Sequence, residues 1–268
     1  MTIPLYVVDA FTDRLFAGNP AAVCLLDRWP PDGWLQLLGR EMNLSETAVL
    51  VRRSETAFEL RWFTPAVEVD LCGHATVASA HALWENGHAP RATLTFTTRS
   101  GTLSASPLSS GEVELDFPAK PATPCDPPAG LLDALGAVAV AVGRNSFDFL
   151  VEMASEADVR GLKPDFRKLA AVACRGVIVT APSNDPAYDF VSRFFAPASG
   201  IDEDPVTGSS HCCLSEYWGD KLGKQEMVGR QISARGGVVR VSRRGARVLL
   251  AGRAVTVSRG ELATRPEG

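Results

Sequence analysis

The chain of 268 residues has few His and Lys, and its Cys lack a metal-binding spacing. It has four His and five Lys, and no HxxxH, HExxH or CxxC spacing. Such spacings place two ligands on one metal ion, so their absence argues against a metal site. None of the Lys lies in a stretch that resembles a cofactor-lysine motif, and no phosphate-binding glycine fingerprint occurs. We therefore expect neither a metal nor an organic cofactor.

Positive charge and long apolar runs are also scarce. The net charge is -4, which leaves no basic surface for nucleic acid or an anionic membrane. The most apolar window, residues 131–143, is interrupted by Asp133 and is far shorter than the roughly 20 residues of a spanning helix. The start, MTIPLYVVDAF, lacks the features of a signal peptide. Six Cys without export features are expected to be reduced thiols, and we expect a cytoplasmic protein.

The sequence contains a weak internal repeat. Residues 58–84 and 189–218 both have Arg, two aromatics, Pro, an acidic loop, Gly and a small-residue helix that ends in Trp. Residues 96–119 resemble 232–254, with an Arg-x-Gly turn and alternating strands, and 45–51 resemble 174–180. A repeated order of several elements indicates a duplicated architecture.

The elements between these repeats predict an α+β fold. The alternation in EVELDF and RVLLAGRAVTVS indicates half-buried antiparallel strands, and the Pro-rich residues 118–130 form a connector. A helix rich in Ala and Ser, such as TVASAHALWENG, suits enclosure by a curved sheet, and Gly87 is its expected stop. We expect two similar halves related by a pseudo-twofold with a cleft between them, residues 1–120 and 121–268, in which the terminal strand can be exchanged.

Two predicted helices begin with Gly and small polar residues, in CGHAT and TGSS. The first turn of a helix presents unpaired N–H groups and the positive end of the helix dipole, which bind carboxylate or phosphate. We expect these helix starts to bind a small anionic substrate through Gly73, Ala75, Gly208, Ser209 and Ser210. The alternative is plain N-capping by Thr207 or Ser209.

Three residues near these helix starts are candidates for proton transfer. Glu46 directly precedes an apolar run, where a carboxylate is costly unless it faces a polar cleft. His74 lies on the first turn of the first helix, where the dipole favours the neutral imidazole. Asp204 is expected at the mouth of the second helix. The structural alternatives are a charge at a strand edge, a satisfied buried His and a carboxylate paired with a helix dipole. A serine hydrolase is disfavoured because TGSS lacks the Gly-x-Ser-x-Gly elbow.

The chain resembles the PhzF-like family of phenazine-biosynthesis isomerases, within the diaminopimelate-epimerase-like superfamily. The motifs are VDAFTDRLFAGNPAAVCLL, MNLSETAVL, RWFTPAVEVDLCGHATVASAHALW, DEDPVTGSSHC and QISARGGVVRV, which cover nearly the whole chain. The resemblance implies two similar halves, each a mixed, mostly antiparallel sheet rolled around a central helix, and a homodimer. It also implies that Glu46 is the catalytic carboxylate, with His74, Asp204 and Ser209 in the same site.

We therefore expect a cofactor-independent isomerase that shifts a proton on a small carboxylate, cyclic or amino acid, by general acid/base catalysis. One alternative is an amino-acid racemase or epimerase that uses Cys72 with Glu46 or Asp204. In related racemases two Cys act as a pair, whereas here only Cys72 matches and the second position falls in residues 204–206. The other alternative is a non-catalytic metabolite-binding or interaction module. No nucleic acid or membrane partner is expected.

Overall fold

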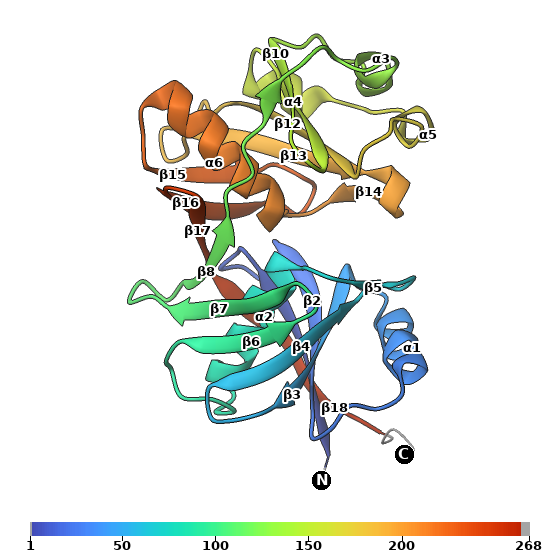
Figure 1. Cartoon of the computed structure of the whole chain (residues 1–268), viewed down its shortest axis with the longest axis vertical. Coiled ribbons are helices and arrows are strands. Elements are labelled where there is room, and N and C mark those ends of the chain that lie inside the picture. Colours follow the sequence, from blue (N-terminus) through green and yellow to red (C-terminus); the bar gives the residue numbers. More distant parts are fainter. Residues whose placement is uncertain (1, 264–268) are drawn as a thin grey trace. The chain divides into compact units, whose positions relative to one another are not determined.

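The computed structural model describes residues 2–263 of the chain, which folds into two compact units (Figure 1). The first unit is Met1–Asp116 with Ala251–Gly268, and the second is Phe117–Leu250. The chain passes from one unit to the other within strands β8 (Val113–Pro118) and β17 (Arg247–Gly252). The sequence analysis placed the boundary near residue 120 and allowed the terminal strand to be exchanged between the halves.

The first unit is a mixed sheet with two helices. Its elements are β1 (Ile3–Ala10), β2 (Asn19–Leu26), α1 (Asp32–Met42), β3 (Glu46–Arg52), β4 (Ala57–Phe63), β5 (Glu68–Val69), α2 (Gly73–Glu85), β6 (Leu94–Thr98), β7 (Gly101–Pro107), β8 and β18 (Ala254–Leu262). Strand β18 pairs antiparallel with β1, so the end of the chain completes the sheet in which its beginning lies.

The second unit has a longer helical insertion but a similar core. Its elements are β9 (Thr123–Pro124), α3 (Leu131–Leu135), β10 (Ala141–Arg144), β11 (Asp148–Glu152), α4 (Glu156–Gly161), α5 (Phe166–Leu169), β12 (Gly176–Pro182), β13 (Phe190–Ala196), the 3-10 turn η1 (Pro197–Ser199), β14 (Ile201–Asp204), α6 (Gly208–Leu222), β15 (Glu226–Gln231), β16 (Gly237–Arg244) and β17. The Pro-rich connector is irregular except for Pro118, the last residue of β8, and the two residues of β9, as its composition predicts.

The strands of the two units pair in the same order and sense. In the first unit β1–β2 are antiparallel, β2–β3 parallel, β3–β4 and β4–β5 antiparallel, β4–β6 parallel and β6–β7 antiparallel. In the second unit the same series runs β10–β11, β11–β12, β12–β13, β13–β14, β13–β15 and β15–β16. The long helices α2 and α6 occupy equivalent places in these series. The prediction of two similar α+β halves, inferred from the weak repeat, is confirmed.

Helix α2 is buried on nearly all sides. It packs against β1, β2 and β3, and only Gly73, His81, Trp84 and Glu85 of its 13 residues are not buried. The Ala and Ser side chains allow this close enclosure, and the buried hydroxyl of Ser79 donates to the carbonyl of Ala75 at 2.7 Å. The helix ends at Asn86 and Gly87, and Gly87 has φ +69°. The predicted stop is therefore confirmed.

Strand β3 lies between two helices, and this arrangement decides which way its side chains point. The core beneath α1 contains Val49 and Val51 of β3 together with Leu35 and Leu38 of α1. Because side chains alternate along a strand, Glu46, Ala48 and Leu50 point to the opposite face, which α2 covers. Glu46 is thus directed toward the start of α2. Within residues 2–263, no helix is both long enough and apolar enough to cross a membrane.

Candidate active site

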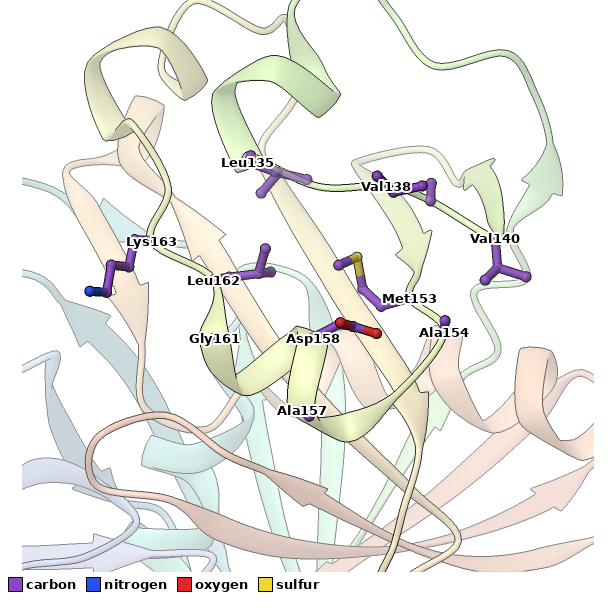
Figure 2. Close-up of a pocket in the computed structure, with 12 residues that line it drawn as sticks. Leu135, Val138, Val140, Met153, Ala154, Ala157, Asp158, Gly161, Leu162 and Lys163 are labelled. Carbon is purple, nitrogen blue, oxygen red and sulfur yellow. The ribbon is translucent and has the colours of Figure 1, made fainter.

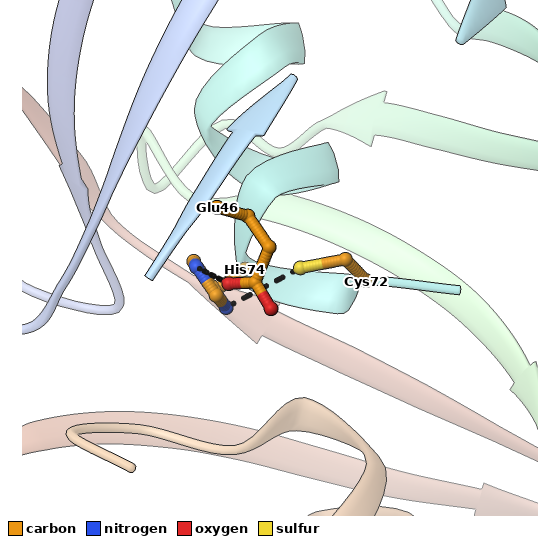
Figure 3. Close-up of side chains that lie close together, drawn as sticks. All are labelled: Glu46, Cys72 and His74. Carbon is orange, nitrogen blue, oxygen red and sulfur yellow. Dashed lines mark hydrogen bonds and ion pairs between the residues drawn. The ribbon is translucent and has the colours of Figure 1, made fainter. Parts of the chain in front are cut away.

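Glu46, Cys72 and His74 meet at the start of α2 in the first unit (Figure 3). Glu46 is the first residue of β3, Cys72 is the N-cap of α2 and His74 is the second residue of that helix. The residues are 9%, 6% and 5% exposed, respectively. Nε2 of His74 lies 3.0 Å from Oε2 of Glu46, and Nδ1 lies 3.5 Å from Sγ of Cys72. Two of the three predicted catalytic residues are therefore in contact, together with the thiol of the racemase alternative.

Glu46 and His74 each have a buried side-chain atom that can still form a hydrogen bond. Oε2 and Nε2 are within ion-pair distance, but neither atom makes a hydrogen bond of acceptable geometry within the described part of the chain. Buried polar atoms in native proteins are nearly always paired, and exceptions often mark functional sites. Glu46 and His74 can therefore contact a ligand without breaking a strong internal bond.

Burial and charge act in opposite directions at this cluster. Burial raises the pKa of Cys72 to about 11, and the charge of Glu46 adds to this effect. Burial lowers the pKa of His74, but negative charges on Cys72 and Glu46 together raise it well above its ordinary value. At neutral pH the buried thiol is uncharged, so Glu46 alone then favours the imidazolium, and burial, the largest single effect on the pKa of His74, favours the neutral ring.

The same three side chains form the one group within residues 2–263 whose ligand atoms could surround a metal ion, all within 4.8 Å of one another. The geometry fits this role poorly. His74 meets Glu46 through Nε2 and Cys72 through Nδ1. The two ring nitrogens point in different directions, so an ion bound to one nitrogen is reached by only one of the other two ligands in this arrangement. The arrangement suits an imidazole that bridges an acid and a thiol.

The second unit holds Asp204 in a hydrogen-bonded turn before α6. The hydroxyl of Thr207 donates to Oδ2 of Asp204 at 2.5 Å, and the backbone N–H of Thr207 donates to Oε1 of Gln231 at 2.9 Å. The amide of the fully buried Gln231 also donates to the carbonyl of Asp204 at 2.7 Å. Gln231, which the sequence analysis did not single out, therefore fixes the turn that presents Asp204.

Gly208, Ser209 and Ser210 form the first turn of α6, but their side chains differ in role. The buried hydroxyl of Ser210 donates to the carbonyl of Thr207 at 2.8 Å, so within this arrangement its backbone N–H is the group left for a ligand. The hydroxyl of Ser209 accepts a hydrogen bond from Nη2 of Arg175 at 3.0 Å. Arg175 in turn forms a bidentate ion pair with the buried Asp148, at 2.8 and 2.5 Å.

Within the described residues, neither long helix is capped by a side chain at its N-terminus. The N-cap of α2 is Cys72 and that of α6 is Thr207, and neither side chain accepts a hydrogen bond from the first turn. The alternative of plain N-capping by Thr207 or Ser209 is therefore wrong for α6, because Thr207 donates to Asp204 and Ser209 is inside the helix. Gly73 and Ala75 occupy the first and third positions of α2. Uncapped first turns keep donors for an anion.

The equivalent strands and helices of the two units carry different chemistry. Glu46 pairs with Ala21 in the β2–β3 ladder, and Gly176 pairs with Asp148 at the same place in β11–β12. A Cβ at Gly176 would lie 2.3 Å from the ring of Phe194, so no side chain fits there without a shift. Thr207 is the N-cap of α6, as Cys72 is the N-cap of α2, so Thr207 is the structural equivalent of Cys72. The sequence analysis placed the equivalent of Cys72 in residues 204–206, which was wrong. The second unit thus has a hydroxyl where the first has a thiol.

The second unit also has a separate hollow, at some of its loops and short helices (Figure 2). It has a volume of about 580 Å³ and is lined mainly by apolar residues such as Leu135, Val138 and Met153. Its acid, Asp158, accepts a hydrogen bond from the hydroxyl of Ser155 at 2.7 Å. None of the site residues predicted from the sequence lines it.

Comparison with known proteins places this arrangement in a family. An uncharacterized isomerase of Halalkalibacterium halodurans is 52% identical over 98% of this chain and 99% of that protein. The crystal structure of a phenazine biosynthesis protein of the PhzF family from Enterococcus faecalis has 38% identity and a TM-score of 0.93, and the match covers 98% of this chain and 100% of that chain. A structure described as a predicted epimerase from Pseudomonas aeruginosa, 20% identical over 98% of this chain and 99% of that chain, has a TM-score of 0.75 and shares the fold.

The family model for phenazine biosynthesis-like proteins, PhzC-PhzF, matches residues 8–260, which is nearly the whole chain. Together with the duplicated mixed sheets and the relatives described above, this match confirms the resemblance inferred from the five motifs. The chain belongs to the PhzC-PhzF family of phenazine biosynthesis-like proteins.

Proposed function

We propose that the protein is an isomerase that moves a proton between carbons of a small carboxylate, with Glu46 as the acid–base group. The observation that carries the proposal is the buried Oε2 of Glu46, 3.0 Å from Nε2 of His74 and without a hydrogen bond of acceptable geometry within the described chain. A carboxylate in this position can exchange a proton with a substrate carbon. The isomerase names of curated relatives support the reaction class.

In the proposed reaction Glu46 takes a proton from a carbon next to an electron-withdrawing group. The C–H bond breaks, its electron pair is delocalised over the substrate's unsaturated system, and Glu46 becomes the carboxylic acid. Glu46 exchanges the proton with solvent while it holds it and then returns a proton to another carbon, where a new C–H bond forms, so no oxidant, reductant or co-reactant is consumed. Nε2 of His74, beside Oε2, is placed to hydrogen-bond the carboxyl group as its charge changes.

The proposed anchor for the substrate carboxylate is a helix start. The N–H groups of Gly73 and Ala75 belong to the uncapped first turn of α2, close to His74. A carboxylate bound there is favoured by the N–H donors and by the helix dipole. The first turn of α6 has the same character, and we propose that Gly208, Ser209 and Ser210 bind an anionic group and that Asp204 orients the substrate. The turn held by Gln231 supports that role because it fixes the position of Asp204.

The racemase alternative requires a second base, and Cys72 is the available thiol. Burial raises the pKa of this thiol to about 11, which disfavours the reactive thiolate at neutral pH. The equivalent N-cap of the second unit is Thr207, whose hydroxyl is engaged by Asp204. These two facts support an isomerase with a single carboxylate base over a racemase with a pair of thiols. A protein that only binds a metabolite does not need a buried carboxylate beside an imidazole, so the Glu46–His74 pair favours an enzyme.

We further propose that no metal or organic cofactor takes part, and that the protein acts as a homodimer in the cytoplasm. Light scattering on the purified protein tests the dimer.

The reaction is tested by solvent exchange. The protein is incubated in heavy water with a panel of cyclic and amino-acid carboxylates, and deuterium in each compound is followed by NMR. We expect deuterium at one or two carbons of a matching compound, accompanied by a double-bond shift. Exchange with inversion at a single stereocentre supports the racemase instead. A compound that binds without exchange supports the binding module.

A further inference from the structure

Asn19 contacts the candidate site from a third element of the first unit. It is the first residue of β2, and its side chain is fully buried. The core beneath α1 contains Cys24 and Leu26 of the same strand. By alternation, Asn19 lies on the opposite face, which α2 covers. Its Nδ2 is 3.1 Å from Nδ1 of His74. Neither the family resemblance nor the motif spacing assigned this residue a role.

The backbone holds Asn19 in a fixed place. It pairs with Ala10 at the end of the β1–β2 ladder. The preceding Gly18 has φ +64°, and a Cβ there would lie 2.2 Å from the carbonyl oxygen of Ala10. Only glycine fits this close approach, and the tight turn therefore restricts the backbone position of Asn19 at the end of the ladder.

We propose that Asn19 is a positioning residue that sets the tautomer of His74. An amide nitrogen has N–H donors and no lone pair to offer, so Nδ1 must accept the hydrogen bond. The single ring proton of a neutral imidazole then lies on Nε2, the nitrogen that faces Oε2 of Glu46 at 3.0 Å. Asn19 thereby directs the proton of His74 to the acid–base group.

Cys72 strengthens this assignment. Its Sγ lies 3.5 Å from the same Nδ1, and its raised pKa, about 11, keeps the thiol protonated at neutral pH. A protonated thiol has no negative charge that would draw a proton onto Nδ1. A thiolate–imidazolium pair would require a proton on Nδ1, which would face the N–H groups of Asn19 in the observed orientation of the amide. Asn19 thus disfavours the ion pair that the racemase alternative needs.

The consequence for catalysis depends on the proposed function. An Nε2–H group 3.0 Å from Oε2 turns its partial positive charge toward Glu46 and so favours the carboxylate form that accepts a proton from carbon. A reversed tautomer would turn a lone pair toward that carboxylate and destabilise it. Replacement of Asn19 is therefore expected to lower the rate of catalysis more than it changes the affinity for substrate.

The test reads the protonation of His74 directly. The full chain is labelled with ¹⁵N, and the imidazole nitrogens are observed by long-range ¹H–¹⁵N NMR between pH 6 and 8, roughly the range in which free His titrates. Four His give a simple spectrum, and the signals that disappear in His74→Gln belong to His74. We expect an unprotonated Nδ1 and a protonated Nε2 in the protein without substrate.

Asn19→Asp replaces the donor by an acceptor of nearly the same shape. We expect Nδ1 of His74 to become protonated, and the exchange rate on a confirmed substrate to fall roughly 10²-fold with KM changed less than about threefold. Asn86→Asp is the matched control, because Asn86 is the C-cap at the other end of α2 and its amide donates to Ala82 at 2.8 Å. It should change neither the signals of His74 nor the rate.

A protonated Nδ1 in the wild-type protein overturns the proposal, as does an unprotonated Nδ1 in a folded Asn19→Asp variant. If that variant does not fold, the wild-type spectrum still decides. The predicted tautomer in a protein that catalyses no exchange would refute the proposed function and leave the assignment of Asn19 intact.

Discussion

Replacing Glu46 by Gln separates an enzyme from a binding protein. The amide keeps the size and one oxygen of the carboxylate but cannot accept a proton from carbon. We expect solvent exchange on a confirmed substrate to fall by roughly 10²-fold or more, the scale of a positioned general base. This corresponds to about 2.7 kcal/mol of transition-state stabilisation, at about 1.36 kcal/mol for each factor of ten. Substrate binding, measured by calorimetry, should persist because the proposed partners of the carboxylate are helix N–H groups near Gly73.

Glu152→Gln is the matched control for this substitution. Glu152 is also a buried glutamate, 5% exposed, but it lies in β11 of the second unit and accepts from Tyr217 at 2.6 Å and from Lys221 at 2.5 Å. Its loss should lower the free energy of unfolding by roughly 1–3 kcal/mol and leave the exchange rate unchanged. Wild-type exchange by Glu46→Gln would refute the assignment of Glu46, and Cys72 would become the next candidate base.

Four further outcomes are expected. Cys72→Ser should keep exchange within about tenfold of wild type, whereas a thiol racemase would lose it. Dialysis against a chelator should leave exchange intact, and stoichiometric zinc whose removal abolishes exchange would refute cofactor independence. Gly18→Ala should lower the free energy of unfolding in urea by at least about 2 kcal/mol, because the new Cβ meets the Ala10 carbonyl at 2.2 Å. Burial lowers the pKa of His211 to about 4, so between that pH and about 6.5 the unfolded chain binds the proton more readily. The contribution of neutral His211 to the free energy of unfolding, roughly 3 kcal/mol, is therefore complete above about pH 6.5 and is lost as the pH falls toward 4. Urea titrations of wild type and His211→Leu at both pH values measure this contribution. The same pH dependence in both proteins would refute the prediction.

The fold could be inferred from the sequence because duplication repeats local signals. The Arg-aromatic strand, the acidic loop and the small-residue helix recur as β4–α2 and β13–α6, in equivalent places of the two units. Their alternation and helix stops are local properties that need no tertiary information. The sequence allowed the terminal strand to be exchanged between the halves, but it did not give the residue at which the chain changes units. The stretch RVLLAGRAVTVS alternates without interruption in the sequence, yet β17 and β18 divide at Arg253 and the chain changes units at residue 250.

The site was predictable only where a residue carries its chemistry in its own side chain. Glu46 and His74 are an acid and an imidazole near a predicted helix start, and they meet because β3 alternates toward α2. Asn19 and Gln231 are neutral amides in unremarkable strand sequences. The proposed role of Asn19 and the position of Gln231 depend on contacts over 55 and 24 residues of sequence separation, respectively, which no local pattern encodes.

The two units show how one duplicated framework can be given opposite chemistry at equivalent positions. In the first unit, the place next to the helix start holds the Glu46 carboxylate and an imidazole. In the second, Gly176 takes the place of that carboxylate, and the neighbouring Arg175 donates to Ser209 of α6. The ring of Phe194 occupies the space that a side chain at Gly176 would need. A carboxylate side chain at the equivalent place would therefore require the ring of Phe194 to move. The proposed function, removal and return of a proton by one acid–base group, fits this asymmetry better than a symmetric pair of bases does.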